Sequence, residues 1–522
     1  MKLNFTLGSA LTIASAFSFA NSESEQVRPN ILFAFGDDWG RYASIYHEIE
    51  ECNTVNSIIH TPNIDRVASE GALFMNAHVT APQCTPCRSS LLSGKYFWRT
   101  GRGAILQGAV WEPEIPSYPL ILQEEGYHIG RTYKVWFPGQ PPNAPYGGAG
   151  NSFEQFGTDF NRFSQTVLQQ SEPENIEAEI QRLYNEVVGN FESFLDAREE
   201  GQPFCYWWGP WNTHRVWARG SGKILWDIDP DDLIGKMPEG YPDVHEIRED
   251  FADYLGEVLA FDHALGLILN KLEEIGEIDN TLIVLSGDHG IPGFPRAKSN
   301  LYGLGTHVAL MARLPSMIEE GRVIEDFVNL MDLAPTFLEA GGVEVPENMD
   351  GKSLIPLFEA QGSGIIDADR NYVITGFERH VAAARPGNRG YPSRAITKMV
   401  DGKKYKYIRN FRPERWPIGT RDRGFMDIDG GPTKSWYLNN FCNPIYTEYI
   451  ELAFGKRPYE EFYDLENDPY EVNNLAEVPE FNEIKMLLAE KLESVLIETE
   501  DPRMVDGISV YDRLPFTIPH NQ

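Results

Sequence analysis

Two apolar runs of this chain end directly in pairs of polar side chains, and this feature limits the possible folds most. Residues 30–36 (NILFAFG) are followed by two aspartates, and residues 280–287 (NTLIVLSG) by an aspartate and a histidine. Short, continuous apolar runs of this kind are typical of strands buried on both faces of a parallel sheet. Because ligands of such sheets collect at the carboxyl ends of the strands, we expect the two pairs to meet there. The four polar residues are Asp37, Asp38, Asp288 and His289.

The segments around these runs alternate between strand-like and helix-like patterns. Strands are predicted at residues 72–79 and 204–209, and another begins at Tyr127. Apolar residues at helical spacing over residues 248–275 predict a long amphipathic helix. This alternation predicts an α/β fold in which a large, mainly parallel or mixed sheet is sandwiched by helices. Shorter helices are predicted at residues 63–71, 88–92 and 120–126.

The pattern changes near residue 365, where a second unit is predicted to begin. Short strands joined by charged turns are predicted there, and the chain has a terminal helix over residues 482–499. We therefore expect a large α/β domain over residues 28–365 and a smaller C-terminal α+β domain over residues 366–522. The strands expected in the smaller domain are 370–377, 395–400 and 403–409.

Residues 1–20 have the pattern of a secretory signal peptide. Lys2 supplies the positive start, residues 7–19 are apolar or small, and residues 18–20 form a small-x-small cleavage pattern. The run is shorter than the roughly 20 apolar residues that span a bilayer, and no later segment is long and apolar enough to do so. We expect a protein that is secreted or periplasmic after the peptide is removed.

Charge and cysteine content exclude several classes of partner. The formal net charge of −32 repels nucleic acid and anionic lipid, so neither is expected to bind. The five cysteines are widely and irregularly spaced, which argues against a disulfide scaffold. Because their number is odd, one thiol is expected to be free or to have another use.

The motif Cys84-Thr-Pro-Cys87-Arg88, which continues to Gly94, indicates what that use is. A redox or zinc pair of Cys84 and Cys87 is one interpretation, but a zinc site needs a second ligand pair, and the sequence has none at similar spacing. The motif instead resembles the signature of the type I sulfatases, a formylglycine-dependent family of the alkaline phosphatase superfamily. In that family the cysteine is oxidised to formylglycine, whose hydrated aldehyde is the nucleophile.

The resemblance also assigns a metal and the sulfate-binding residues. It implies one Ca²⁺, which suits a cluster rich in carboxylates, although a histidine ligand is unusual for calcium. It implies that Lys134, Lys298 and Arg88 bind sulfate oxygens and offset their charge, and that His214 protonates the leaving sugar oxygen. Singly, each of these residues is more often structural or on the surface, but their order and spacing support one site. The implied metal ligands are Asp37, Asp38, Cys84 as formylglycine, Asp288 and His289.

The chain departs from the family pattern in one place. The family has a histidine two or three residues after Lys134 that contacts sulfate, whereas Trp136 and Phe137 stand there in this chain. The reaction class is unaffected, but the way in which sulfate is released is left open.

Within the family, the likeness is greatest to sulfamidase (heparan N-sulfatase) and its bacterial relatives that act on polysaccharides. The segment Glu378-Arg379-His380, which we expect to bind substrate, is part of this likeness, as are residues 279–283 and 498–502. Lys298 stands where the sulfamidase pattern has arginine, which favours an O-sulfate ester over an N-sulfamate.

We therefore expect a sulfuric ester hydrolase that acts on a sulfated oligo- or polysaccharide, such as ulvan or carrageenan, and is matured by the formylglycine-generating enzyme. Sulfamidase activity is the alternative. A phosphatase or phosphodiesterase of the same superfamily is disfavoured by the cysteine motif and the few histidines, and a lectin-like protein by the full set of catalytic residues. Three tryptophans could stack on sugars or belong to the core, namely Trp136, Trp211 and Trp217.

Overall fold

The computed structural model describes residue 1 and residues 28–169, 172–505 and 511, so all but the first residue of the predicted signal peptide lies outside it. The central element is a seven-stranded sheet with the strand order β3-β4-β1-β5-β6-β2-β7. Strand β6 is antiparallel to both of its neighbours, and the other pairs are parallel. This confirms the predicted mixed, mainly parallel sheet. The strands are β1 (Asn30–Gly36), β2 (Ala72–His78), β3 (His128–Tyr133), β4 (Phe204–Gly209), β5 (Thr281–Gly287), β6 (Leu310–Arg313) and β7 (Arg322–Asn329).

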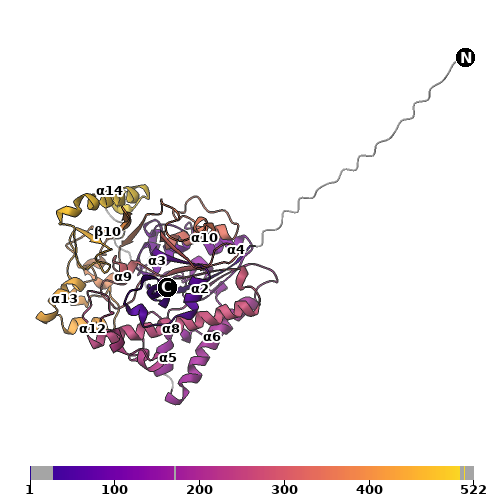
Figure 1. The fold of residues 1–522 in the computed structure, drawn as a ribbon, viewed down its shortest axis with the longest axis horizontal. Helices are drawn as coiled ribbons and strands as arrows, with labels where there is room; N and C mark the ends of the chain where they lie inside the picture. Colours follow the sequence, from indigo (N-terminus) through magenta and orange to yellow (C-terminus); the bar gives the residue numbers. More distant parts are fainter. Residues whose placement is uncertain (2–27, 170–171, 506–510, 512–522) are drawn as a thin grey trace.

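Helices cover both faces of this sheet, as predicted (Figure 1). In β1, Leu32 belongs to one core and Phe33 to the other, and every residue of β1, β4 and β5 is buried. Burial on both faces explains why these strands read as continuous apolar runs. One core is covered by α6 (Ile176–Asp196) and α8 (His245–Glu274), the other by α4 (Tyr118–Glu124) and α10 (Leu333–Ala340).

Of the remaining helices, α14 has 17 residues and the others have ten or fewer. The predicted helix at residues 88–92 begins earlier than expected, at Cys84. The bounds are α1 (Ser44–Glu50), α2 (Pro62–Ser69), α3 (Cys84–Ser93), α5 (Phe163–Gln169), α7 (Ser221–Trp226), α9 (Gly303–Thr306), α11 (Ile355–Glu359), α12 (Pro432–Asn439), α13 (Thr447–Phe454), α14 (Asn482–Glu498) and α15 (Pro502–Val505).

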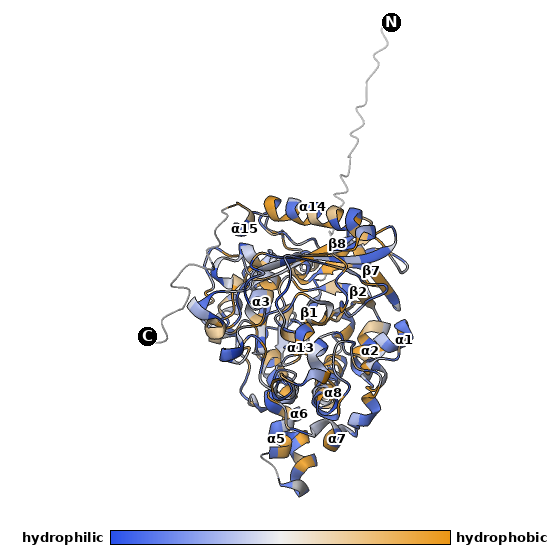
Figure 2. Ribbon diagram, turned by 90° about the vertical axis from the view of Figure 1, so that its left-hand side faces the viewer, coloured by the Kyte–Doolittle hydropathy of each residue, from blue (hydrophilic) through white to orange (hydrophobic). Residues whose placement is uncertain are grey.

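A second, antiparallel sheet has four strands in the order β11-β10-β9-β8. Helix α14 packs over it, and Figure 2 shows this pair at the opposite end of the molecule from α6 and α8. Ile396, Phe462 and Leu492 contribute to the core between helix and sheet. The strands all follow residue 365, as expected for the C-terminal α+β region. They are β8 (Tyr372–Phe377), β9 (Ser393–Val400), β10 (Lys403–Asn410) and β11 (Glu460–Asp464).

Part of the C-terminal region packs with the large sheet. Ile418, Phe425 and Phe454 belong to the same core as helix α8, and α12 contacts α8 directly. The segment between β10 and β11 is thereby held near the carboxyl edge of the large sheet. The domain boundary near residue 365 stays a prediction.

Two further expectations concern membranes and disulfides. Within the described ranges, no helix combines the length and apolarity needed to cross a bilayer. The five cysteines all lie in these ranges, and each is a free thiol.

Candidate active site

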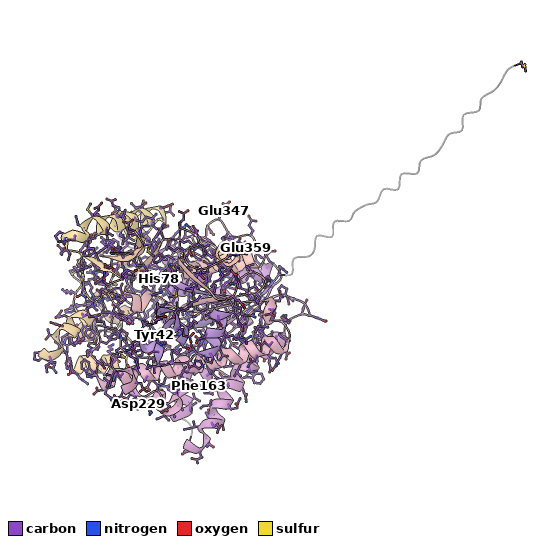
Figure 3. All side chains as sticks on the ribbon, in the orientation of Figure 1. Tyr42, His78, Phe163, Asp229, Glu347 and Glu359 are labelled. Carbon is purple, nitrogen blue, oxygen red and sulfur yellow. The ribbon has the colours of Figure 1, made fainter. Side chains whose placement is uncertain are left out.

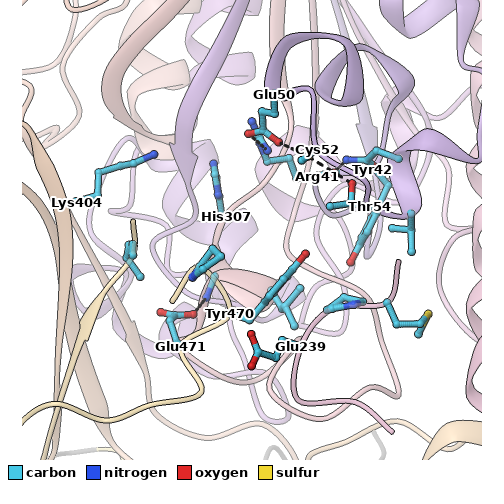
Figure 4. Close-up of a pocket in the computed structure, with 18 of the residues that line it drawn as sticks. Arg41, Tyr42, Glu50, Cys52, Thr54, Glu239, His307, Lys404, Tyr470 and Glu471 are labelled. Atoms are coloured by element: carbon cyan, nitrogen blue, oxygen red, sulfur yellow. Dashed lines mark hydrogen bonds and ion pairs between the residues drawn. The ribbon is translucent and has the colours of Figure 1, made fainter. Parts of the chain in front are cut away.

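Two cavities of similar volume open in the described part of the chain. The larger, of about 630 Å³, is lined by the buried residues Tyr42 and His78, which Figure 3 labels, and by an Arg41–Glu50 ion pair (Figure 4). It contains none of the predicted site residues. The smaller, of about 570 Å³, holds six of them and is the candidate active site. These six are Asp37, Cys84, Lys134, His214, Lys298 and His380.

The adjacent strands β1 and β5 bring the two polar pairs together. They run parallel with Gly36 opposite Gly287, so Asp37 and Asp288 leave the sheet at the same level. The Asp38 amide donates to Asp288 Oδ1 at 2.8 Å, with Asp38 in the left-handed region (φ 62°). The predicted meeting of the two pairs at the carboxyl ends of the strands is confirmed.

Cys84 is the first residue of α3, and its side chain is buried beside these carboxylates. Its Sγ lies 3.4 Å from His289 Nε2 and 4.0 Å from Asp38 Oδ1. Burial raises the pKa of the Cys84 thiol well above its usual value, and the negative charge of Asp37 adds to the effect. Because the thiolate is the reactive form of cysteine, unmodified Cys84 would be a poor nucleophile here. A helix N-terminus is nevertheless a favourable place for an anionic substrate.

The residues around Cys84 form a donor set for a metal ion. Ligand atoms of Asp38, Cys84, Asp288 and His289 all lie within 4.8 Å of one another. Two of these four ligands are carboxylates, and an oxygen of formylglycine in place of the Cys84 sulfur would make oxygen three of the four, which fits a hard divalent cation. Burial raises the pKa of Asp38 to about 7, although Lys298 and His289 oppose this. A bound cation would favour its ionised form, so the cluster fits the metal that the resemblance implies.

Two lysines pair with the aspartates and reach the cavity. Lys134 Nζ lies 2.6 Å from Asp37 Oδ1, and Lys298 Nζ lies 2.9 Å from Asp38 Oδ2. Burial raises the pKa of Asp37, but Lys134 and Arg88 outweigh it and hold the pKa well below the usual value. Both ammonium groups are therefore positioned to donate to oxygens of a bound anion.

Arg88 lies beneath the cavity and does not line it. Its Nε donates to Asp288 at 2.9 Å, its Nη2 to Asp37 at 3.0 Å, and its Nη1 to the Lys134 and Val135 carbonyl oxygens. These contacts occupy all three nitrogens of the fully buried guanidinium. Arg88 thus orients the carboxylates of Asp37 and Asp288, whereas the sequence led us to expect contact with sulfate.

His214 faces the cavity from the segment after β4. Its Nδ1 lies 2.7 Å from the Arg215 carbonyl oxygen, which assigns the Nδ1 proton and leaves Nε2 free to carry the second one. Nε2 lies 3.8 Å from Asp38 Oδ2, and burial lowers the pKa of His214. Of the three tryptophans considered above, only Trp211 lines the cavity, since Trp136 and Trp217 are buried.

The three consecutive residues expected to bind substrate are separated by the structure. Glu378 is buried and accepts from Arg394 at 2.7 Å and from Arg503 at 2.8 Å. Arg379 is also buried, and its Nη2 donates to the Gln107 carbonyl oxygen. Only His380 reaches the cavity, where it supplies an imidazole besides that of His214.

Asp429 is a cavity residue that the sequence analysis did not single out. Its Oδ2 lies 3.1 Å from Lys298 Nζ, the same ammonium group that contacts Asp38. The only local signal is an Asp-x-Asp-Gly-Gly segment, which is typical of a turn. Its position depends on how the C-terminal region packs against α8.

The mixed sheet, flanked by helices and with acidic side chains at the ends of adjacent strands, has the alkaline phosphatase-like fold. Residues 29–343 match the Sulfatase family, so this chain belongs to the sulfatases. It is 27% identical to an ulvan-active sulfatase of Formosa agariphila, covering 88% of this chain and 78% of that one. It is also 27% identical to human N-sulphoglucosamine sulphohydrolase, covering 91% and 92%.

Solved structures show the same fold. A protein in complex with its substrate D-glucosamine-2-N,6-O-disulfate has a TM-score of 0.60 at 20% identity, covering 91% of this chain and 98% of that one. Phosphonate monoester hydrolase of Agrobacterium radiobacter has a TM-score of 0.58 at 18% identity, covering 90% and 96%. This chain is therefore a sulfuric ester hydrolase, in a family that generally uses formylglycine and a divalent metal.

Proposed function

We propose that the enzyme removes O-sulfate groups from an algal-type polysaccharide such as ulvan or carrageenan, or from its oligosaccharides. Formylglycine made from Cys84 would be the nucleophile and Ca²⁺ the metal. The observation that carries this proposal is the position of Cys84, at the start of α3 and beside the carboxylate cluster and Lys298.

The chain's own residues would divide the work as follows. Asp37, Asp38, Asp288 and His289 would hold the ion with residue 84, oriented by Arg88. The formylglycine hydrate would supply the nucleophilic oxygen, and the ion would polarise the sulfate group. Lys134 and Lys298 would donate to the sulfuryl oxygens, and His214 Nε2 would protonate the leaving sugar oxygen.

The substrate class rests on the relatives and on Lys298. The named activity of the Formosa relative supports an algal polysaccharide. The human relative supports N-sulfoglucosamine as the alternative substrate. Lys298, where the sulfamidase pattern has arginine, favours the O-sulfate.

We further propose that the enzyme works outside the cytoplasm. The predicted leader at residues 1–20 supports export, and a polysaccharide substrate is too large to cross a membrane unaided. Maturation would require the formylglycine-generating enzyme as a partner.

Two measurements test these proposals. Mass spectrometry of the tryptic peptide that contains residue 84 should find formylglycine. Released sulfate should then be measured on defined oligosaccharides from ulvan and carrageenan, with N-sulfoglucosamine in parallel. Release from N-sulfoglucosamine alone would contradict the O-sulfate proposal, and an unmodified Cys84 in fully active enzyme would contradict the formylglycine proposal.

A further inference from the structure

Asp429 adds a negatively charged carboxylate to a cavity that should bind an anionic substrate. It lines the same cavity as Cys84, and its Oδ2 is 3.1 Å from Lys298 Nζ. Lys298 thus lies between two carboxylates, since its Nζ also donates to Asp38 at 2.9 Å. Burial raises the pKa of Asp429, but Lys298, His214 and His380 outweigh it and hold the pKa well below the usual value. The ion pair with Lys298 thus favours the ionised form of Asp429.

The charges at the site show what this carboxylate changes. Four carboxylates face three side-chain cations, which leaves a formal excess of one negative charge while the imidazoles are neutral. A divalent cation would turn this into one net positive charge, which matches a sulfate ester, a monoanion. Without Asp429 the site would carry two positive charges and match a dianion. The carboxylates are Asp37, Asp38, Asp288 and Asp429, and the cations are Arg88, Lys134 and Lys298.

We propose that Asp429 sets the charge of the cavity so that it accepts a sulfate monoester and disfavours dianions. Two dianions matter. Inorganic sulfate is the product, and weaker binding speeds its release. A phosphate monoester is a dianion above its second pKa, near 6. The fold itself does not choose between sulfur and phosphorus, because a phosphonate monoester hydrolase shares it. The inference rests on the sulfate ester hydrolysis established above, and it adds a residue that selects by charge.

A purely positioning role for Asp429 is the competing explanation. If Asp429 only held Lys298 in place, its loss would weaken the binding of every anion by a similar factor. If Asp429 acts by charge, its loss must improve the binding of dianions more than that of monoanions. The repulsion energy that is removed is proportional to the charge of the ligand. Methyl sulfate and inorganic sulfate are suitable probes, since both present sulfuryl oxygens but carry one and two negative charges.

The experiment measures dissociation constants by calorimetry at pH 8 for methyl sulfate, inorganic sulfate and inorganic phosphate. Enzyme carrying Cys84→Ala serves as the background, so that methyl sulfate is not consumed. Adding Asp429→Asn keeps the size and a carbonyl acceptor for Lys298 but removes the charge. We expect the preference for sulfate and phosphate over methyl sulfate to rise roughly 10- to 100-fold. With the nucleophile intact, Asp429→Asn should also strengthen product inhibition by sulfate.

Two controls separate the explanations. Asp429→Glu retains the charge and should leave the preference near that of the parent. Glu154→Gln removes one charge from a residue that lines the same cavity but pairs with Arg131, and should change the preference by less than about 3-fold. An unchanged preference in a folded Asp429→Asn variant, or an equal change in Glu154→Gln, would overturn the proposal. Because the probes are small anions, the outcome does not depend on which polysaccharide is the substrate.

Discussion

The molecule contains two clusters of largely buried ion pairs that differ in charge balance. The strand-end cluster, defined by Asp37, Asp38, Asp288, Asp429, Arg88, Lys134 and Lys298, borders the active-site cavity. The C-terminal cluster joins the small sheet to α15 and is formed by Glu378, Asp501, Arg394 and Arg503. In the first, carboxylates outnumber cations. In the second, two carboxylates face two arginines, and neither Glu378 nor Arg394 is exposed.

This difference shows that the burial of charged side chains does not by itself indicate a functional site. Charges taken out of water are tolerated when partners of opposite sign surround them, as in the C-terminal cluster. An uncompensated group is costly and calls for a ligand, as in the strand-end cluster. The sequence resemblance grouped Glu378 with the substrate-binding residues, whereas in the structure its carboxylate forms ion pairs with Arg394 and Arg503. The following four experiments test this contrast, from the largest expected effect to the smallest.

Replacement of Cys84 should have the largest effect. Cys84→Ala and Cys84→Ser should each lower kcat by about 10⁴-fold or more, because neither side chain can form the aldehyde hydrate. Cys87→Ala is the matched control, since Cys87 is buried in the same helix and should leave turnover largely intact. Steady-state assays with thermal melts check both. Near-normal turnover in a verified Cys84→Ser variant would refute the formylglycine nucleophile.

Removal of the metal should abolish activity and lower the melting temperature, because the strand-end cluster then keeps its excess negative charge. Calcium should restore both better than zinc, as expected for oxygen-rich ligands. Asp37→Ala and Asp288→Ala should each behave like the chelated enzyme. The C-terminal cluster needs no ion by this reasoning. The metal assignment fails if chelated enzyme stays fully active and elemental analysis shows no metal.

His214→Ala should lower kcat/KM on a carbohydrate sulfate by roughly 10²–10⁴-fold, because a sugar alcohol leaves poorly without a proton. The loss should be far smaller on an aryl sulfate that the wild type accepts, since a nitrophenolate leaves well unprotonated. Lys298→Ala should lower kcat/KM by similar factors on both substrates, because Lys298 faces sulfuryl oxygens common to both. If His214→Ala lowers kcat/KM equally on the two substrates, His214 positions the substrate and does not act as the general acid.

Disruption of the balanced cluster should affect stability and not catalysis. Glu378→Gln leaves Arg394 and Arg503 without a charged partner at that position, so we expect unfolding to cost about 3–5 kcal/mol less. Folded enzyme should keep kcat/KM within about twofold. Denaturant titration and initial rates measure the two quantities. A large rise in KM with unchanged stability would instead support the prediction that Glu378 binds substrate.

Several features were determined by the sequence alone, because short-range patterns carry them. Strand β1 has the bounds that its apolar run predicts, and β5 begins one residue later than expected. Gly94 ends α3 in the left-handed conformation (φ 66°), a role that glycine fills at little cost. The polar pairs meet because parallel strands that are neighbours in the sheet end at the same edge.

Tertiary structure alone decided the features that depend on contacts between distant segments. Glu378 and His380 are two residues apart, yet one faces Arg394 and the other the cavity, and no local pattern separates them. Arg88 contacts both Asp37 and Asp288 because these residues follow the adjacent strands β1 and β5. Asp429 reaches Lys298 because the C-terminal region shares a core with α8. Local sequence limits backbone conformation, whereas side-chain partners are chosen by packing, and the charge balance of the site follows from those partners.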